Sequence, residues 1–259
     1  MQIKRIARLA VMATVIIGTA CAMLSTAAAA RTAPAGNAIR AAAKKNRYVF
    51  VTFYKDNHST STDMLADVRS IQGKLASRAD FVSVDVGDKA DREVVARYGA
   101  DRSPIPLTIV IAPNGAITGG FPREIKKADL SDVFVSDGTA TVLKVMQSRK
   151  IAAVCLESSR TKYNKQCSAT ARGVKSDSRL GGAVEIVTID PSDRSEAKLL
   201  KQWGVSGDSA NAQLVVVAPP GRIMGKFDGA VSRDSVMGNL MKSMSGGCSG
   251  GSCGPGGCK

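Results

Sequence analysis

Three cysteines near the C-terminus are the residues whose type and spacing most clearly suggest chemistry. Cys248, Cys253 and Cys258 recur every five residues in a segment rich in glycine and serine. Thiolates are ligands for soft metals such as Cu(I), and glycines would let the backbone wrap around an ion. The same thiols suit a disulfide or thiol–disulfide exchange with a substrate. The tail therefore predicts thiol chemistry and leaves its kind open.

The composition of this tail, residues 245–259, predicts a disordered segment that packs against no core. Zn(II) fits less well than Cu(I), because structural zinc sites take four ligands at closer cysteine spacings. Two alternatives remain. Two of the cysteines could form a disulfide while the third stays free or bonds to a partner, or the thiols could simply be oxidised without a role.

Two further cysteines, Cys155 and Cys167, lie in an apolar run and in a helical pattern, respectively. Both are expected to be buried, where cysteine often behaves as a small apolar residue. In an oxidising compartment they would form a disulfide if their Cα atoms lie about 4.4–6.8 Å apart. A pair of buried free thiols is the alternative.

The segment that must position these residues contains an internal repeat. Residues Phe81–Phe121 align with Glu185–Phe227, in diverged sequence and with one inserted residue near Gly207. Matching segments are Tyr98-Gly99 with Trp203-Gly204, and residues 107–115 with 213–221. An internal repeat of this kind indicates that one αβ unit of roughly a hundred residues occurs twice.

Hydrophobic periodicity predicts the same elements in each copy. In the first copy we expect helix 37–45, strand 48–54, helix 59–75, strand 81–86, helix 91–98, strands 107–112 and 116–121, and a closing helix. In the second we expect helix 141–148, strand 150–156, helix 163–175, strand 184–189, helix 196–203 and strands 214–218 and 222–227. This alternation predicts an α/β fold, in which a mixed sheet carries helices on both faces.

The first copy resembles the thioredoxin family, and the second does so more weakly. The resemblance rests on residues 48–54, 84–86, 97–99, 105–107 and 114–115, and it implies two tandem thioredoxin-like domains. Active relatives carry two cysteines, separated by two residues, at the N-terminus of the helix after the first long strand. Here that position reads His58-Ser59-Thr60-Ser61, without a thiol. A conventional dithiol oxidoreductase is therefore disfavoured.

Pro106, preceded by Ile105, matches the cis-proline of the family, which faces the active-site loop. The resemblance implies that a groove for an extended peptide survives there, lined by His58, Ser59, Ser61, Ile105 and Pro106. The alternatives are a proline kept as scaffold, and a His58 that carries protons or belongs to a polar loop and helix cap. In the second copy the motif falls near Thr161–Asn164 and Ala212 replaces the proline, so no functional residue is assigned there.

Residues 1–30 read as a signal peptide, with Lys4, Arg5 and Arg8 before an apolar run and an A-x-A site at 27–30. An uncleaved membrane anchor and a lipid anchor at Cys21 are the alternatives. The protein is thus expected to be exported, to the periplasm or cell envelope, where disulfides persist.

The expected organisation is a signal peptide at 1–30, domains at 31–130 and 137–244, and the tail at 245–259. The net charge of +14 comes from scattered residues, which favours solubility over a binding patch, and no nucleic-acid partner is expected. The predicted function is that of an exported, redox-inactive binding or scaffold protein for envelope proteins or extended peptides. Handling of Cu(I), or thiol exchange, by the tail is the alternative.

Overall fold

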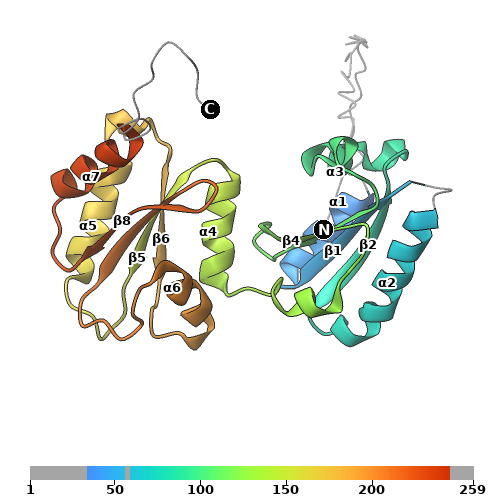
Figure 1. Cartoon of the computed structure of the whole chain (residues 1–259), viewed down its shortest axis with the longest axis horizontal. Helices are drawn as coiled ribbons and strands as arrows, with labels where there is room; N and C mark the ends of the chain where they lie inside the picture. Colours follow the sequence, from blue (N-terminus) through green and yellow to red (C-terminus); the bar gives the residue numbers. More distant parts are fainter. Residues whose placement is uncertain (1–33, 56–58, 246–259) are drawn as a thin grey trace, which may run out of the picture. The chain divides into compact units, whose positions relative to one another are not determined.

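Two four-stranded sheets organise the chain, one in each copy of the repeat (Figure 1). The computed structural model describes residues 34–55 and 59–245. The expected signal peptide with Cys21, the loop residue His58 and the tail with Cys248, Cys253 and Cys258 lie outside the described residues. No helix within the described ranges is long and apolar enough to cross a membrane.

The elements of domain 1 follow the order expected from the sequence up to its last strand. They are α1 (Pro34–Lys44), β1 (Tyr48–Tyr54), α2 (Ser59–Leu75), β2 (Ala79–Asp85), α3 (Arg92–Arg97), β3 (Leu107–Ile111) and β4 (Ile117–Pro122). β1 is the central strand because its seven residues, mostly aromatic or β-branched, suit a strand buried on both faces.

Domain 2 repeats these elements and adds a last helix. They are α4 (Asp137–Gln147), β5 (Ile151–Leu156), α5 (Asn164–Lys175), β6 (Val184–Ile189), α6 (Ala197–Trp203), β7 (Gln213–Ala218), β8 (Arg222–Asp228) and α7 (Arg233–Ser245). Helix α4 begins a turn earlier than the expected Thr141, because the side chain of Ser136 caps it by accepting a hydrogen bond from the Thr139 N–H.

The two sheets have the same strand order and the same mixed pairing. The orders are β2-β1-β3-β4 and β6-β5-β7-β8. In each sheet the first two strands in sequence pair in parallel, and the remaining pairs are antiparallel. Both hairpins shift register at the same place, between Val110 and Ile111 and between Val216 and Val217. The predicted mixed α/β architecture is confirmed in both copies.

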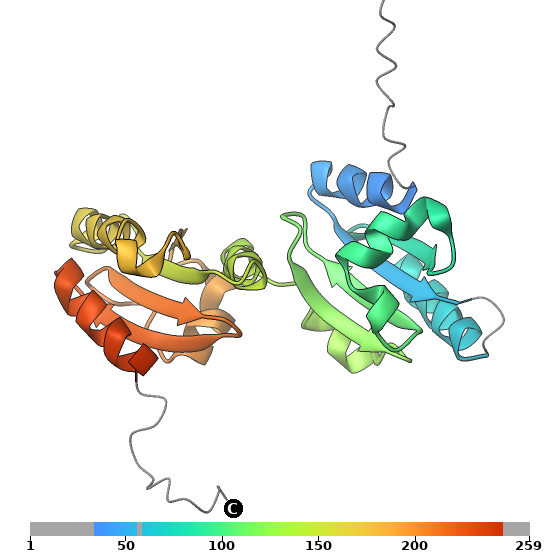
Figure 2. The ribbon, with the colours of Figure 1, turned by 90° about the horizontal axis from the view of Figure 1, so that it is seen from above.

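Helices cover both faces of each sheet, as the alternating side chains of the central strands require. In domain 1, Val49, Val51 and Phe53 of β1 pack against α1 and α3, whereas Phe50 faces α2. In domain 2, α5 and α7 cover one face and α4 and α6 the other (Figures 1 and 2).

The closing helix expected in domain 1 is absent, and this prediction was wrong. After β4 the chain forms only a short 3₁₀ helix, η3 (Lys127–Ser131), and an irregular segment before α4. Side chains of this stretch, including Val133 and Phe134, cover the α2 face of the sheet. Gly119 permits the close approach, since a Cβ there would lie 2.5 Å from Cγ1 of Val133. The segment is therefore held by packing rather than by helical hydrogen bonds.

Each domain caps its first helix with a buried carboxylate from the turn before its third helix. Asp91 accepts a hydrogen bond from the Ala35 N–H at 2.9 Å. Glu196 accepts bonds from the Gly138 N–H at 2.9 Å and from the Ser136 hydroxyl at 2.6 Å. Carboxylates suit a helix N-terminus because its first N–H groups lack partners within the helix. The two residues occupy equivalent positions in the repeat, so both copies share this helix cap.

An ion pair at the parallel edge is also repeated. In domain 1 the Arg47 guanidinium lies 2.7 Å from the Asp80 carboxylate. In domain 2 the Lys150 ammonium lies 2.5 Å from Glu185, which also pairs with Lys175 at 2.8 Å. Asp80 and Glu185 stand at the same register position, opposite Val49 and Ala152. In both copies an ion pair thus lies at the start of the parallel strand pair, β1–β2 or β5–β6.

Candidate functional site

The residues predicted to line a peptide groove in domain 1 gather at one end of its sheet. β1 ends at Tyr54 and β3 begins at Leu107, and the register pairs Phe53 with Leu107. Helix α2 begins at Ser59, shortly after β1, and Ile105 and Pro106 directly precede β3. Antiparallel pairing of β1 and β3 therefore brings the start of α2 and the proline loop to the same edge.

The proline loop has the form that the family resemblance implies. The Ile105–Pro106 peptide bond is cis, and Pro106 is buried. The Pro106 carbonyl accepts a hydrogen bond from the Arg123 N–H at 3.0 Å. Ile105 is half-buried, and its peptide N–H and C=O make no hydrogen bond to any residue in the described part of the chain. The loop thus offers backbone groups at a sheet edge.

The start of α2 brings two serines to this end of the sheet. Ser59 is exposed, whereas Ser61 is only 4% exposed. The Ser61 hydroxyl has no hydrogen-bond partner among the described residues. The N–H groups of a helix's first turn are also free of intrahelical partners. This corner therefore supplies hydrogen-bond donors but no thiol and, in the described residues, no histidine.

The equivalent edge of domain 2 is filled by its own chain. There the connection from β5 remains extended as far as Lys162, which pairs with Asn211 as an isolated parallel bridge. The Lys162 N–H donates to the Ala210 carbonyl at 2.9 Å, and its carbonyl accepts from the Ala212 N–H at 2.8 Å. Since Ala212 directly precedes β7, as Pro106 precedes β3, Lys162 pairs with the loop that corresponds to the proline loop of domain 1. We call Lys162 the strap residue.

Side chains hold the strap in place. The Thr161 hydroxyl donates to Oδ1 of Asn164 at 2.6 Å and accepts from the Ser158 N–H at 2.8 Å. The Asn164 amide donates to the Ser158 carbonyl at 2.6 Å. Tyr163, which is 49% exposed, adopts a left-handed φ of 65° at the start of α5. The sequence placed the lost motif near Thr161–Asn164, and the structure gives these residues a loop-closing role.

Cys155 and Cys167 are both buried, as the sequence predicts, and both are free thiols. Cys155 lies in β5 and Cys167 in α5, and both belong to one buried apolar cluster. The neighbouring Cys167 thiol lowers the pKa of Cys155, whereas Cys155 and burial raise the pKa of Cys167. The disulfide stays a prediction.

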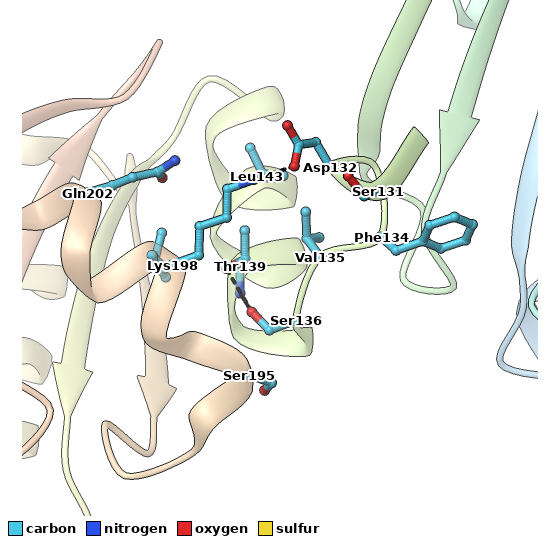
Figure 3. A pocket seen from close by; sticks show the side chains of 11 residues that line it. Ser131, Asp132, Phe134, Val135, Ser136, Thr139, Leu143, Ser195, Lys198 and Gln202 are labelled. Carbon is cyan, nitrogen blue, oxygen red and sulfur yellow. Dashed lines mark hydrogen bonds and ion pairs between the residues drawn. The ribbon is translucent and has the colours of Figure 1, made fainter. Parts of the chain in front are cut away.

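A separate pocket of about 330 Å³ lies beside the segment that leads into α4. Figure 3 shows its lining, which consists mainly of hydroxyl and aliphatic side chains. Its one acidic residue, Asp132, pairs with Lys198 at 2.9 Å, and both side chains are mostly exposed. The pocket therefore contains no catalytic pair, and it is distinct from the two sheet ends.

Metal ligands do not gather in the described part of the chain. Within residues 34–55 and 59–245, no three side chains of histidine, cysteine, aspartate or glutamate are grouped for an ion. The Cu(I) or Zn(II) site predicted for the tail lies outside these ranges and stays a prediction.

Sequence reasoning missed the strap residue and the two capping carboxylates. A signal for the carboxylates was present, because Asp91 and Glu196 align in the repeat when Tyr98-Gly99 is matched to Trp203-Gly204. No comparable signal marked Lys162, because its contribution is made by its backbone.

No protein-family model matches the chain, and no curated protein matches it. Solved structures with a similar course include the germline thioredoxin Deadhead of Drosophila, at 19% identity over 39% of this chain and 90% of that one, with a TM-score of 0.31. Fasciola hepatica thioredoxin shares 17% identity over 43% of this chain and 96% of its own, with a TM-score of 0.32.

A third similar structure contains the first two thioredoxin domains of Eps1p from Saccharomyces cerevisiae. It shares 11% identity over 79% of this chain and 94% of its own, with a TM-score of 0.29. The assignment of fold rests on the chain's own topology: the repeated strand order, the helices on both faces and the cis-proline before β3. By these features the chain has a thioredoxin-like fold in each of its two halves.

Proposed function

We propose that this chain is an exported, non-enzymatic binding protein whose domain 1 holds an extended peptide segment. The observation that carries this proposal is that the Ile105 N–H and C=O have no partner among the described residues. In domain 2 the corresponding loop is occupied by its own chain, because Lys162 bonds to the Ala210 carbonyl and the Ala212 N–H. An extended peptide can add to an unpaired edge through backbone hydrogen bonds, with side-chain pockets giving specificity.

Chemistry at the groove supports binding over catalysis. Thioredoxin-type exchange needs an attacking thiolate and a resolving thiol. Ser59 and Ser61 hold the motif position, and a serine hydroxyl cannot form a disulfide. The nearly buried Ser61 hydroxyl, without a partner among the described residues, is available to a ligand's polar group.

The test uses the full chain and a chemically unfolded protein whose own cysteines are blocked, labelled for fluorescence anisotropy. We expect micromolar binding that Pro106→Ala weakens about tenfold, because the substitution would let the loop relax and misdirect the Ile105 peptide groups. Asn211→Ala at the equivalent edge of domain 2 is the matched control and should leave binding unchanged. Equal binding by wild type and Pro106→Ala would remove this groove from the proposal.

A second assay separates binding from catalysis. Insulin reduction in the presence of dithiothreitol should be no faster with the wild-type chain than without it. An acceleration that persists when Cys248, Cys253 and Cys258 are all replaced by serine would show that a folded domain is an oxidoreductase after all.

The second candidate function rests on the regular spacing of the tail cysteines. We infer that, if the tail handles a soft metal, anaerobic titration with Cu(I) will give tight, stoichiometric uptake by the wild type. The variant with serine at Cys248, Cys253 and Cys258 should then lose it. Equal uptake by both chains would exclude the tail as the site.

A further inference from the structure

We propose that Cys155 and Cys167 are a covalent modification site, at which oxidation forms a disulfide joining β5 to α5 inside the core of domain 2. The proposal is independent of peptide binding by domain 1. It concerns two nucleophilic groups that the proposed function does not use.

The placement of the two thiols carries the argument. Cys155 is 0% exposed and Cys167 is 1% exposed, and both belong to the apolar cluster beneath α5 and α7. Cys155 stands opposite Thr188 on one side and Leu214 on the other, within the central strand. Its side chain belongs to the cluster on the face that α5 covers, and Cys167 of α5 is in the same cluster. A strand and the helix packed over it thus carry two thiols in one buried cluster, which places them for a bond between β5 and α5.

In domain 1 the two equivalent positions are filled by residues other than cysteine. There Thr52 replaces Cys155, and its hydroxyl pairs at 2.9 Å with the hydroxyl of Thr108 on the neighbouring strand. Met64 of α2 fills the space of Cys167. In domain 2, Leu214 stands where Thr108 would be, so the strand offers Cys155 no such partner. Domain 2 thus lacks the strand–strand hydroxyl pair of domain 1 and has, at the strand and helix positions, two buried residues that can bond covalently.

Oxidation proceeds by two exchange steps with a low-molecular-weight disulfide such as oxidised glutathione. The Cys155 thiolate attacks one sulfur of that disulfide, forming a mixed disulfide and releasing one small thiolate. The Cys167 thiol then loses its proton and attacks Sγ of Cys155, releasing the second small thiolate. Two protein thiols give up two protons and two electrons, and the small disulfide is reduced to two thiols. Because both cysteines are buried, the exchange takes place before or during folding of domain 2.

The bridge would close a short loop that contains the strap residue. The residues between the two cysteines include Glu157, Ser158 and Lys162, which form the β5–α5 connection. A cross-link stabilises chiefly by restricting the unfolded chain. It would also fix the connection whose backbone fills the edge of domain 2.

Peptide mapping of the full chain tests the bond directly. The protein is refolded with oxidised glutathione, unfolded in guanidinium with iodoacetamide, and digested with trypsin. The cysteines fall in separate tryptic peptides, 151–160 and 166–172, and the tail cysteines in a third that begins at 243. We expect the first two to be linked to each other, and to separate on reduction. Recovery of both as alkylated single peptides, or linked to the tail, would overturn the proposal.

Thermal unfolding gives an independent measurement. Reduction should lower the Tm of the oxidised wild type by roughly 10 °C, as for other short loops closed by a disulfide. The shift should vanish in the variant with both Cys155→Ala and Cys167→Ala. It should persist in the matched control with serine at Cys248, Cys253 and Cys258. A shift that follows the tail cysteines instead would contradict the assignment.

Discussion

Domains 1 and 2 are built on one frame and have diverged at the sheet edge where relatives of this fold place their chemistry. Both cap the first helix with a carboxylate and tie the parallel edge with an ion pair. In domain 1 the Ile105 peptide groups have no partner among the described residues, whereas in domain 2 Lys162, which lies between β5 and α5, bonds to the loop before β7.

The difference shows that the shared buried contacts and the sheet edge are under different energetic constraints. The shared features satisfy buried polar groups, so losing them costs free energy in either copy. The edge has no such requirement, because its backbone groups can be satisfied by the chain itself, by a ligand or by water. One fold can thus retain its internal hydrogen bonds while the hydrogen bonding at this edge differs between its two copies.

The capping carboxylates offer the largest expected effect. Glu196→Ala removes the acceptor of the Gly138 N–H and one of the two acceptors of the Ser136 hydroxyl, which also donates to Oγ1 of Thr139, whereas Asp91→Ala removes only the acceptor of the Ala35 N–H. We expect the free energy of unfolding to fall by about 3 kcal/mol for Glu196→Ala and about 1 kcal/mol for Asp91→Ala. Urea denaturation of the full chain measures both. Equal losses would mean that the two caps are energetically interchangeable, contrary to their contacts.

The segment that replaces the closing helix of domain 1 is tested at two adjacent glycines. A Cβ on Gly119 would lie 2.5 Å from Cγ1 of Val133, whereas one on Gly120 would meet nothing within 4 Å. Gly119→Ala should therefore destabilise the protein by about 2 kcal/mol through overpacking. Gly120→Ala, the matched control, should change stability by less than about 0.5 kcal/mol. A tolerated Gly119→Ala would indicate that the segment moves away from β4 without cost.

The smallest effect concerns acid stability. Lys150 and Lys175 lower the pKa of Glu185 from its ordinary 4.5 to about 2. A carboxylate whose pKa is lowered by folding stabilises the native state above its unfolded pKa, and loses that contribution as pH falls. Between about pH 4.5 and 2 the wild type should therefore lose more stability than Glu185→Gln, in parallel acid titrations followed by circular dichroism. Parallel curves for the two proteins would show that these exposed pairs contribute nothing.

The order of strands and helices was predictable from the sequence because the hydrophobic periodicity and the internal repeat specify it. Strands β1 and β6 begin and end at the expected residues, and the expected helix at 59–75 matches α2. The closing helix was wrong because the apolar residues Val133 and Phe134 pack well in an irregular segment. Few residues also remain for such a helix between β4 and α4, since Ser136 already caps α4. The pattern of apolar residues does not distinguish a helix from an irregular segment here.

The candidate site was only partly predictable. The cis-proline Pro106 and the burial of Cys155 and Cys167 followed from the family resemblance and the alignment of the two copies. The hydrogen bonding at each edge did not, because it depends on backbone groups: Lys162 bonds to Ala210 and Ala212, and the Ile105 N–H and C=O have no partner among the described residues. Any residue other than proline carries those groups, so residue identity says little about them.

The strap at Lys162 also bears on the valency of the proposed binding. A tethered segment competes for its own edge at an effective concentration on the order of millimolar, so a free peptide of ordinary affinity cannot displace it. Two available edges would let one chain hold two extended segments and cross-link its ligands. With the edge of domain 2 filled from within, binding as proposed would engage a single segment at a time and would not cross-link ligands.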